Sequence, residues 1–136
     1  MSAIAKPPTE STPDAPSVVL HDVPWDLYEA LLEAAGDQNV RMTYDRGELE
    51  IMSPLPVHEK WRKVIGRMIE TMSLELDIEM EPLGSTTFRR KDRARGLEPD
   101  ECYYVKNAAA VRNKDTLDLR VDPPPDLAVE VDITSR

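Results

Sequence analysis

The chain has 136 residues, of which 40% are hydrophobic and 32% charged, enough for one domain with a modest core. Its net charge of −9 argues against a protein that coats nucleic acid, because such proteins bind by neutralising many phosphates. No apolar run is long enough for a membrane span, no secretion signal is visible, and a single cysteine, Cys102, is consistent with a reducing cytoplasm.

The N-terminal part of the chain predicts a leader followed by a strand and a helix. Residues 1–17 are rich in proline and polar side chains, so we expect a disordered leader and a domain over residues 18–136. Residues 18–20 can form a short first strand. Pro24 then opens a helix with apolar residues at helical spacing, and Gly36 is a suitable end for it.

A hairpin and a long helix follow. Residues 40–44 and 48–52 read as two strands joined by a turn in which Gly47 can take a positive φ. Residues 57–76 carry the strongest helical pattern in the chain, with an apolar stripe that core packing explains. The stripe consists of Val57, Trp61, Val64, Ile65, Met68, Ile69, Met72 and Leu76.

The second half of the chain predicts mostly strands. Residues 78–82 and 85–89 suggest two strands, and residues 98–105 form an acidic strand that contains a Pro-Asp pair. Residues 107–114 suggest a helical turn, and residues 126–133 a final strand. This order of elements predicts an α+β, or mixed α/β, layer fold.

The final strand carries carboxylates on one face and apolar side chains on the other, because side chains alternate along a strand. Glu130 and Asp132 share the polar face. Neighbouring carboxylates on a rigid strand are costly unless a cation lies between them, and a divalent ion is the usual solution. If this strand lies beside the acidic one, Asp100 and Glu130 could bind one Mg²⁺ or Mn²⁺ ion.

A cluster of basic residues directly precedes the acidic strand. Such a charge run is usually solvated surface, but its place beside candidate metal ligands makes contact with DNA phosphates about equally favoured. The basic residues are Arg89, Arg90, Lys91, Arg93 and Arg95.

Four segments in order resemble the bacterial restriction endonuclease domain family of the PD-(D/E)xK nuclease superfamily. The segments are residues 47–54, 58–59, 96–104 and 123–131. The resemblance implies a restriction-endonuclease-like central mixed sheet flanked by helices, and Mg²⁺-dependent cleavage of DNA. It implies that Asp100 and Glu130 are catalytic metal ligands, that Glu59 on the long helix is a further ligand, and that His58 faces the site.

The chain departs from the family pattern in two ways. The residues that match the (D/E)xK triplet are Glu130, Val131 and Asp132. The triplet thus ends in Asp132, where the superfamily has a lysine that would position and activate the attacking water. Asp132 could be a further catalytic residue or a solvated strand end, and Glu59 and His58 could equally be residues of a helix start. The chain also stops soon after the last strand, so we expect a domain that lacks its C-terminal part, is marginally stable and could form a homodimer.

Three functions therefore stay open at this point. The favoured one is a cytoplasmic Mg²⁺-dependent DNA endonuclease or its inactive shortened form. The alternatives are a non-catalytic binding module with a nuclease fold and a metal-dependent hydrolase of small phosphoesters. A basic side chain near Glu130 and Asp132 in space would favour the nuclease, and an enclosed pocket beside the basic residues would favour the small-phosphoester hydrolase.

Overall fold

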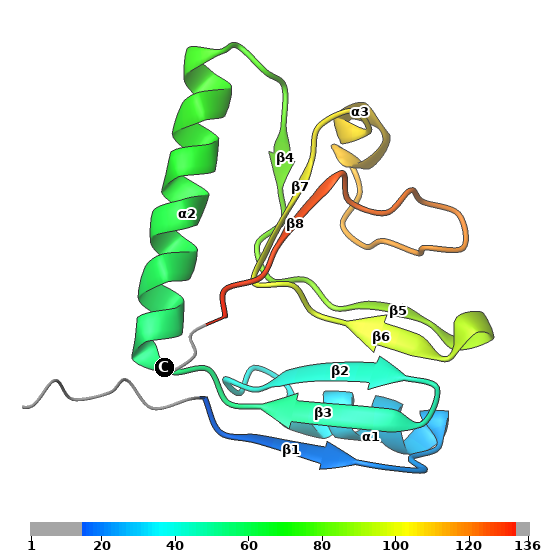
Figure 1. The fold of residues 1–136 in the computed structure, drawn as a ribbon. Helices are drawn as coiled ribbons and strands as arrows, with labels where there is room; N and C mark the ends of the chain where they lie inside the picture. The colour runs from blue at the N-terminus through cyan, green and yellow to red at the C-terminus, as the bar shows by residue number, and fades with distance from the viewer. Residues whose placement is uncertain (1–14, 133–136) are drawn as a thin grey trace, which may run out of the picture.

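The protein is described by a computed structural model that covers residues 15–132 (Figure 1). Within that range the chain forms short and long helices and two antiparallel β-sheets, which confirms the predicted α+β class. The elements are β1 (Ser17–Leu20), α1 (Trp25–Ala35), β2 (Arg41–Asp45), β3 (Glu48–Met52), α2 (Pro56–Glu75), β4 (Glu81–Pro82), β5 (Phe88–Arg90), the 3₁₀ helix η1 (Lys91–Arg93), β6 (Arg95–Leu97), β7 (Glu101–Tyr104), α3 (Ala108–Val111) and β8 (Leu127–Val129).

The first sheet is built around the predicted hairpin. Its strand order is β1-β3-β2-β6-β5, and all neighbouring pairs are antiparallel. The turn between β2 and β3 consists of Arg46 and Gly47, with φ of 47° and 98°. Positive φ at both positions is what a tight two-residue hairpin turn requires, so the expected role of Gly47 is confirmed.

The core of this half lies between α1 and one face of the hairpin. Met42, Tyr44 and Leu49 alternate with polar residues along β2 and β3 and are buried. The ring of Tyr28, fully buried on α1, stacks on that of Tyr44 with centroids 4.7 Å apart. As predicted, Pro24 precedes the helix and Gly36 ends it, with φ 52°.

The second sheet has the order β4-β7-β8 and is also antiparallel. Its central strand β7 contributes Cys102, Tyr103 and Tyr104, all fully buried. Helix α2 runs beside this sheet (Figure 1) and approaches it at Gly66, where an added Cβ would lie 3.2 Å from the Tyr103 hydroxyl. The short helix α3 packs against Tyr104.

The sheets differ from the sequence-based expectations in several details. The expectation of one central mixed sheet is wrong, since the strand pairs of the described chain are antiparallel and form two sheets. The acidic strand begins only at Glu101, because Pro99 cannot donate a ladder hydrogen bond. The final strand is also shorter than expected and ends at Val129, so Asp100 and Glu130 lie just past the strand ends.

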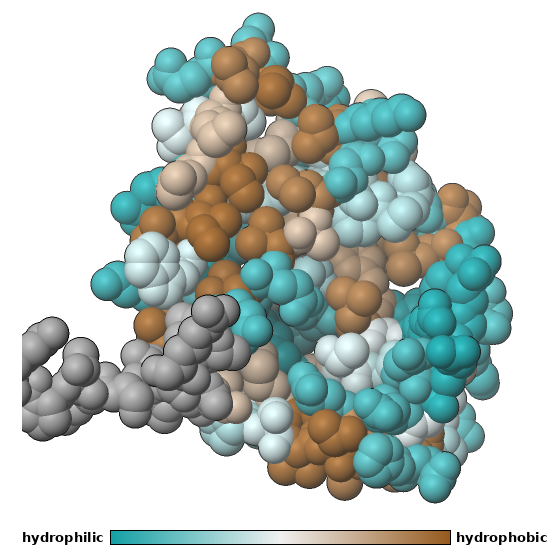
Figure 2. Space-filling view, in the orientation of Figure 1, coloured by the Kyte–Doolittle hydropathy of each residue, from teal (hydrophilic) through white to brown (hydrophobic). Residues whose placement is uncertain are grey.

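The apolar stripe of α2 also differs from the expectation. Only His58 and Gly66 of this helix are buried, whereas Trp61, Met68 and Met72 are 46%, 59% and 58% exposed. Figure 2 shows the resulting gathering of apolar side chains along α2. The expectation that core packing accounts for the whole stripe is therefore wrong within the described residues.

Some expectations fall outside the part of the chain that the structure describes. Residues 1–14 of the predicted leader and Ile133 of the predicted last strand belong to this group, and the described fold begins with β1 at Ser17. The marginal stability, the homodimer and the missing C-terminal part stay predictions. Among residues 15–132, no helix combines the length and apolar character that crossing a membrane requires.

Candidate functional site

Asp100 and Glu130 meet where the β7–β8 pair ends. The register pairs Glu101 with Val129, and one further step along it sets Asp100 opposite Glu130. The Asp100 amide donates to the Val129 carbonyl over 3.0 Å, and the Val131 amide donates to Asp100 Oδ2 over 2.6 Å. The two strands are therefore neighbours, as the hypothesis of a shared cation requires.

A cavity of about 390 Å³ opens beside this pair. Its floor is the polar face of the β2–β3 hairpin, the face opposite the core, and its walls come from α2 and from the ends of β6 and β8. Carboxylates dominate its lining. The lining residues are Ala15, Ser17, Arg41, Thr43, Glu50, Met52, His58, Glu98, Asp100, Glu130, Val131 and Asp132.

Arg41 of β2 is the arginine in this lining, and its side chain is only 12% exposed. Its Nη1 donates to Glu98 Oε1 over 2.6 Å. Its Nη2 lies 3.8 Å from Glu59 Oε1, and its Nε lies 3.8 Å from Asp100 Oδ1. Arg41 thus connects carboxylates from α2 and from the segment between β6 and β7.

The crowding of negative charge affects the pKa of Glu130. Partial desolvation, followed by the charges of Asp100 and Glu50, raises the pKa of this carboxyl, and the charge of Arg41 only partly opposes the rise. The side chain keeps a solvent-exposed surface, so the effect is moderated by water. A cation between Asp100 and Glu130 would relieve this repulsion.

The donor set suits Mg²⁺ chemically, because hard oxygen ligands are what this ion prefers and it keeps several waters when one or two carboxylates hold it. Asp100 is oriented by its bond to Val131, and Glu130 faces the same cavity. Within residues 15–132, however, no three carboxylate, histidine or cysteine side chains are grouped closely enough to form a ready metal cluster. The fit therefore rests on two protein ligands.

Of the other predicted site residues, two line the cavity beside Asp100 and Glu130 and one does not. His58 is 3% exposed and lines the cavity, and its Nδ1 has no hydrogen-bond partner among the described residues. Asp132 also lines the cavity but is exposed. Glu59 sits in the first turn of α2 outside the cavity lining, where its carboxylate accepts from Arg62 over 2.6 Å.

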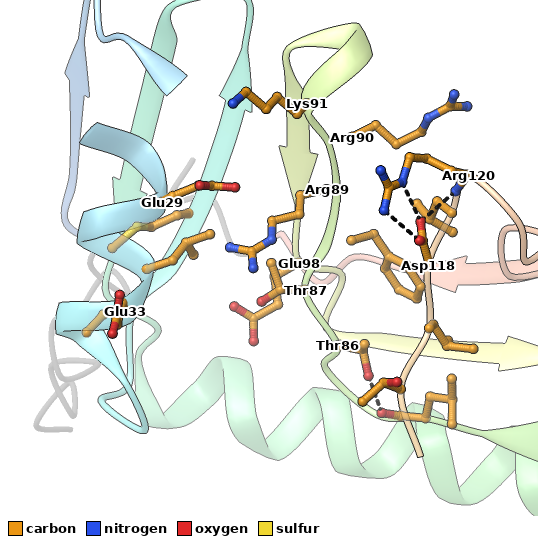
Figure 3. A pocket seen from close by; sticks show the side chains of 18 of the residues that line it. Glu29, Glu33, Thr86, Thr87, Arg89, Arg90, Lys91, Glu98, Asp118 and Arg120 are labelled. Atoms are coloured by element: carbon orange, nitrogen blue, oxygen red, sulfur yellow. Dashed lines mark hydrogen bonds and ion pairs between the residues drawn. The ribbon is translucent and has the colours of Figure 1, made fainter. Parts of the chain in front are cut away.

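The basic cluster forms the β5–β6 hairpin and its 3₁₀ turn instead of a loop. Arg89, Arg90 and Lys91 line a groove of about 1340 Å³, whereas Arg93 and Arg95 do not. In Figure 3, Arg89 extends into this groove between α1 and Glu98, and Arg90 turns to the opposite side. Arg90 is paired with Asp92, and Arg95 with Asp45.

A comparison with known protein families found a match. A family model described as "Putative restriction endonuclease", Uma2, matches residues 25–136.

The chain belongs to the Uma2 family. The matched range contains the residues of the carboxylate cavity from Arg41 onward and the basic hairpin. No curated protein and no solved structure matches the chain.

Two residues of this candidate site were missed by the sequence-based prediction. Arg41 and Glu50 lie on the hairpin, far along the chain from the Pro-Asp pair. The alternation of β2 and β3 could have found them, because the core residues Met42 and Leu49 leave the intervening positions on one polar face. Thr43 pairs with Glu50 across the hairpin, so the polar positions of β2 and β3 lie side by side on that face.

Proposed function

We propose that this chain is a cytoplasmic endonuclease that hydrolyses phosphodiester bonds of DNA with Mg²⁺, or Mn²⁺, as its cofactor. The observation that carries the proposal is the strand register that brings Asp100 opposite Glu130 at the rim of a carboxylate-lined cavity. Membership of the Uma2 family supports the nuclease class. The single cysteine, free and buried, is consistent with a reducing compartment.

The reaction forms a bond between a water oxygen and phosphorus and breaks one P–O ester bond. The water loses a proton and the departing oxygen gains one. A bound divalent cation supplies charge neutralisation at the phosphate and a more acidic water. In the proposal Asp100 and Glu130 hold the cation, and the Val131 amide keeps Asp100 oriented. His58, at the wall of the same cavity, is the side-chain type that most often exchanges a proton in catalysis.

The groove beside the basic hairpin supports a polymeric substrate. Its volume of about 1340 Å³ exceeds that of ordinary small-molecule pockets, which span about 300–1,000 Å³. Arg89 and Lys91 line it and form no ion pair within the described residues, so their charges are available to phosphates. Glu98 lines both the groove, on the α1 side of β2, and the carboxylate cavity, on the other face of that strand, so the two adjoin at this residue.

One alternative has a specific observation behind it. Asp132 stands where the superfamily triplet has lysine, which favours a binding module that has kept the fold and lost the chemistry. The presence of Arg41 in the cavity favours the enzyme instead. A small-phosphoester hydrolase is less well supported, because the groove is larger than such a substrate needs.

We expect the purified chain to nick or linearise plasmid DNA in the presence of Mg²⁺ or Mn²⁺, and EDTA to stop the reaction. Agarose gel electrophoresis of supercoiled plasmid over time measures both. A folded chain that binds DNA without cutting it under either metal would contradict the nuclease and support the binding module. Cleavage that persists in EDTA would contradict the role of the metal.

Replacing both Arg89 and Lys91 with Ala is expected to weaken DNA binding and to flatten its salt dependence. Each phosphate contact on duplex DNA contributes about −0.9 to the slope of log K against log salt, so the slope should change by about 1–2. Fluorescence anisotropy at several salt concentrations measures it. Arg93→Ala is the matched control, because Arg93 belongs to the same hairpin and does not line the groove. If the slope of log K against log salt is equal in the double variant and the control, the hairpin is solvated surface that does not contact phosphates.

A further inference from the structure

The site lacks the lysine of the superfamily triplet, yet its cavity contains a strong positive charge. Asp132 stands in the lysine position and adds a negative charge to the lining. Among the described residues that line the cavity, Arg41 is the one lysine or arginine. It comes from β2, in the floor of the cavity, whereas the triplet follows β8.

The surroundings of Arg41 are unusual for a purely structural ion pair. Its guanidinium binds Glu98 closely, at 2.6 Å, but lies 3.8 Å from both Glu59 and Asp100. Its Nε is buried and has no hydrogen-bond partner among the described residues. A buried donor without a partner is costly, so a closer approach of a neighbouring acceptor to this N–H would be favourable. The nearest carboxylate is that of Asp100, the proposed metal ligand.

We propose that Arg41 is the positioning residue that takes the place of the missing lysine. The proposal rests on the nuclease function above. Its guanidinium holds Glu98 and Asp100 at the cavity and places a positive charge beside the site where the substrate phosphate would lie. Arginine stays protonated in proteins, so Arg41 neutralises and orients but does not take the proton of the attacking water.

The charge of Arg41 has opposite effects on metal binding and on the reaction. A positive charge near Asp100 and Glu130 weakens the binding of a divalent cation by repulsion. The same charge favours the transition state, where negative charge accumulates on the phosphate. A residue that only supports the fold would change metal binding and catalysis in the same direction.

The test compares Arg41→Met with Arg62→Met. Arg62 is 19% exposed and pairs with Glu59 and Glu101, yet it does not line the cavity, so it controls for loss of a partly buried ion pair. We expect Arg41→Met to lower kcat for DNA by about 100-fold at saturating Mg²⁺ and to tighten Mg²⁺ binding several-fold in calorimetric titration. Arg62→Met should leave the Mg²⁺ affinity within about twofold, because it removes no charge from the cavity.

A second comparison covers the case in which Arg41→Met fails to fold because Glu98 loses its partner. The double variant Arg41→Met/Glu98→Gln removes both charges of the pair and is compared with Glu98→Gln alone. We expect kcat of the double variant to be about 100-fold below that of the single one. Equal kcat values, or a parallel loss of metal binding and cleavage, would overturn the role of Arg41. Absence of cleavage and of Mg²⁺ binding in the unmodified chain would overturn the proposed function itself, and this inference with it.

Discussion

Asp100→Asn is expected to reduce Mg²⁺-dependent DNA cleavage by at least about 100-fold and to remove calorimetrically detectable Mg²⁺ binding. Asn has nearly the same shape as Asp, and its amide oxygen can still accept the Val131 N–H that Asp100 Oδ2 now accepts over 2.6 Å. The fold is therefore retained while the buried negative charge is lost. A divalent cation held by only two protein carboxylates depends strongly on each of them.

The matched control for this substitution is Asp26→Asn. Asp26 is an exposed aspartate in the first turn of α1 and lines neither the cavity nor the groove. Glu130→Gln should reproduce the Asp100→Asn result, because Glu130 is the proposed second ligand. If Asp100→Asn binds Mg²⁺ with the affinity of the unmodified chain, the metal is held elsewhere and Asp100 is a structural residue. Circular dichroism of each variant checks that folding is unchanged.

The pairing of Asp100 with Glu130 could be predicted because its causes are local and regular. A Pro-Asp pair and an alternating acidic strand each mark a position along a strand, and antiparallel neighbours bring such positions together. The register that aligns Glu101 with Val129 was not predictable from either strand alone. The strand ends also differed, since Pro99 has no N–H and the ladder therefore does not extend past Asp100.

Arg41 could not be assigned from its sequence neighbours, because its partners Glu98 and Asp100 are more than fifty residues away along the chain. Periodicity predicts which face of a strand is polar, but not what covers that face. The same limit explains α2. Its apolar spacing predicted a helix correctly, yet Trp61 and Met68 are exposed in the described structure, where the helix comes close to the second sheet at Gly66.

Gly96→Ala is expected to destabilise the domain by about 3 kcal/mol, at the upper end of the usual cost of overpacking. An added Cβ would lie 2.7 Å from Cζ and 2.8 Å from Cε1 of Tyr28, and closer still to its hydroxyl oxygen. Tyr28 cannot move aside easily, because it is fully buried and stacked on Tyr44. Urea unfolding followed by circular dichroism measures the loss.

The same substitution should also lower cleavage, because β6 leads directly from Gly96 to Glu98, the partner of Arg41. Gly84→Ala is the control for backbone effects. Gly84 has a positive φ of 62° and no atom within 4 Å of an added Cβ, so its substitution tests conformational strain without a clash and should cost about 1 kcal/mol. A Gly96→Ala variant no less stable than Gly84→Ala would contradict the clash.

Tyr28→Phe gives the decisive comparison, because it removes the atom nearest to the added methyl group. The Tyr28 hydroxyl is buried without a hydrogen-bond partner among the described residues, and burial raises its pKa to about 12. Removing an unsatisfied buried hydroxyl should be neutral or stabilising by up to about 1 kcal/mol. In the Tyr28→Phe background, Gly96→Ala should cost at least about 1 kcal/mol less than in the unmodified chain, but more than nothing, since the ring carbons still crowd the methyl group. If the two substitutions are additive, the Tyr28 hydroxyl and the added methyl group do not compete for this space, and the predicted clash with the hydroxyl is wrong.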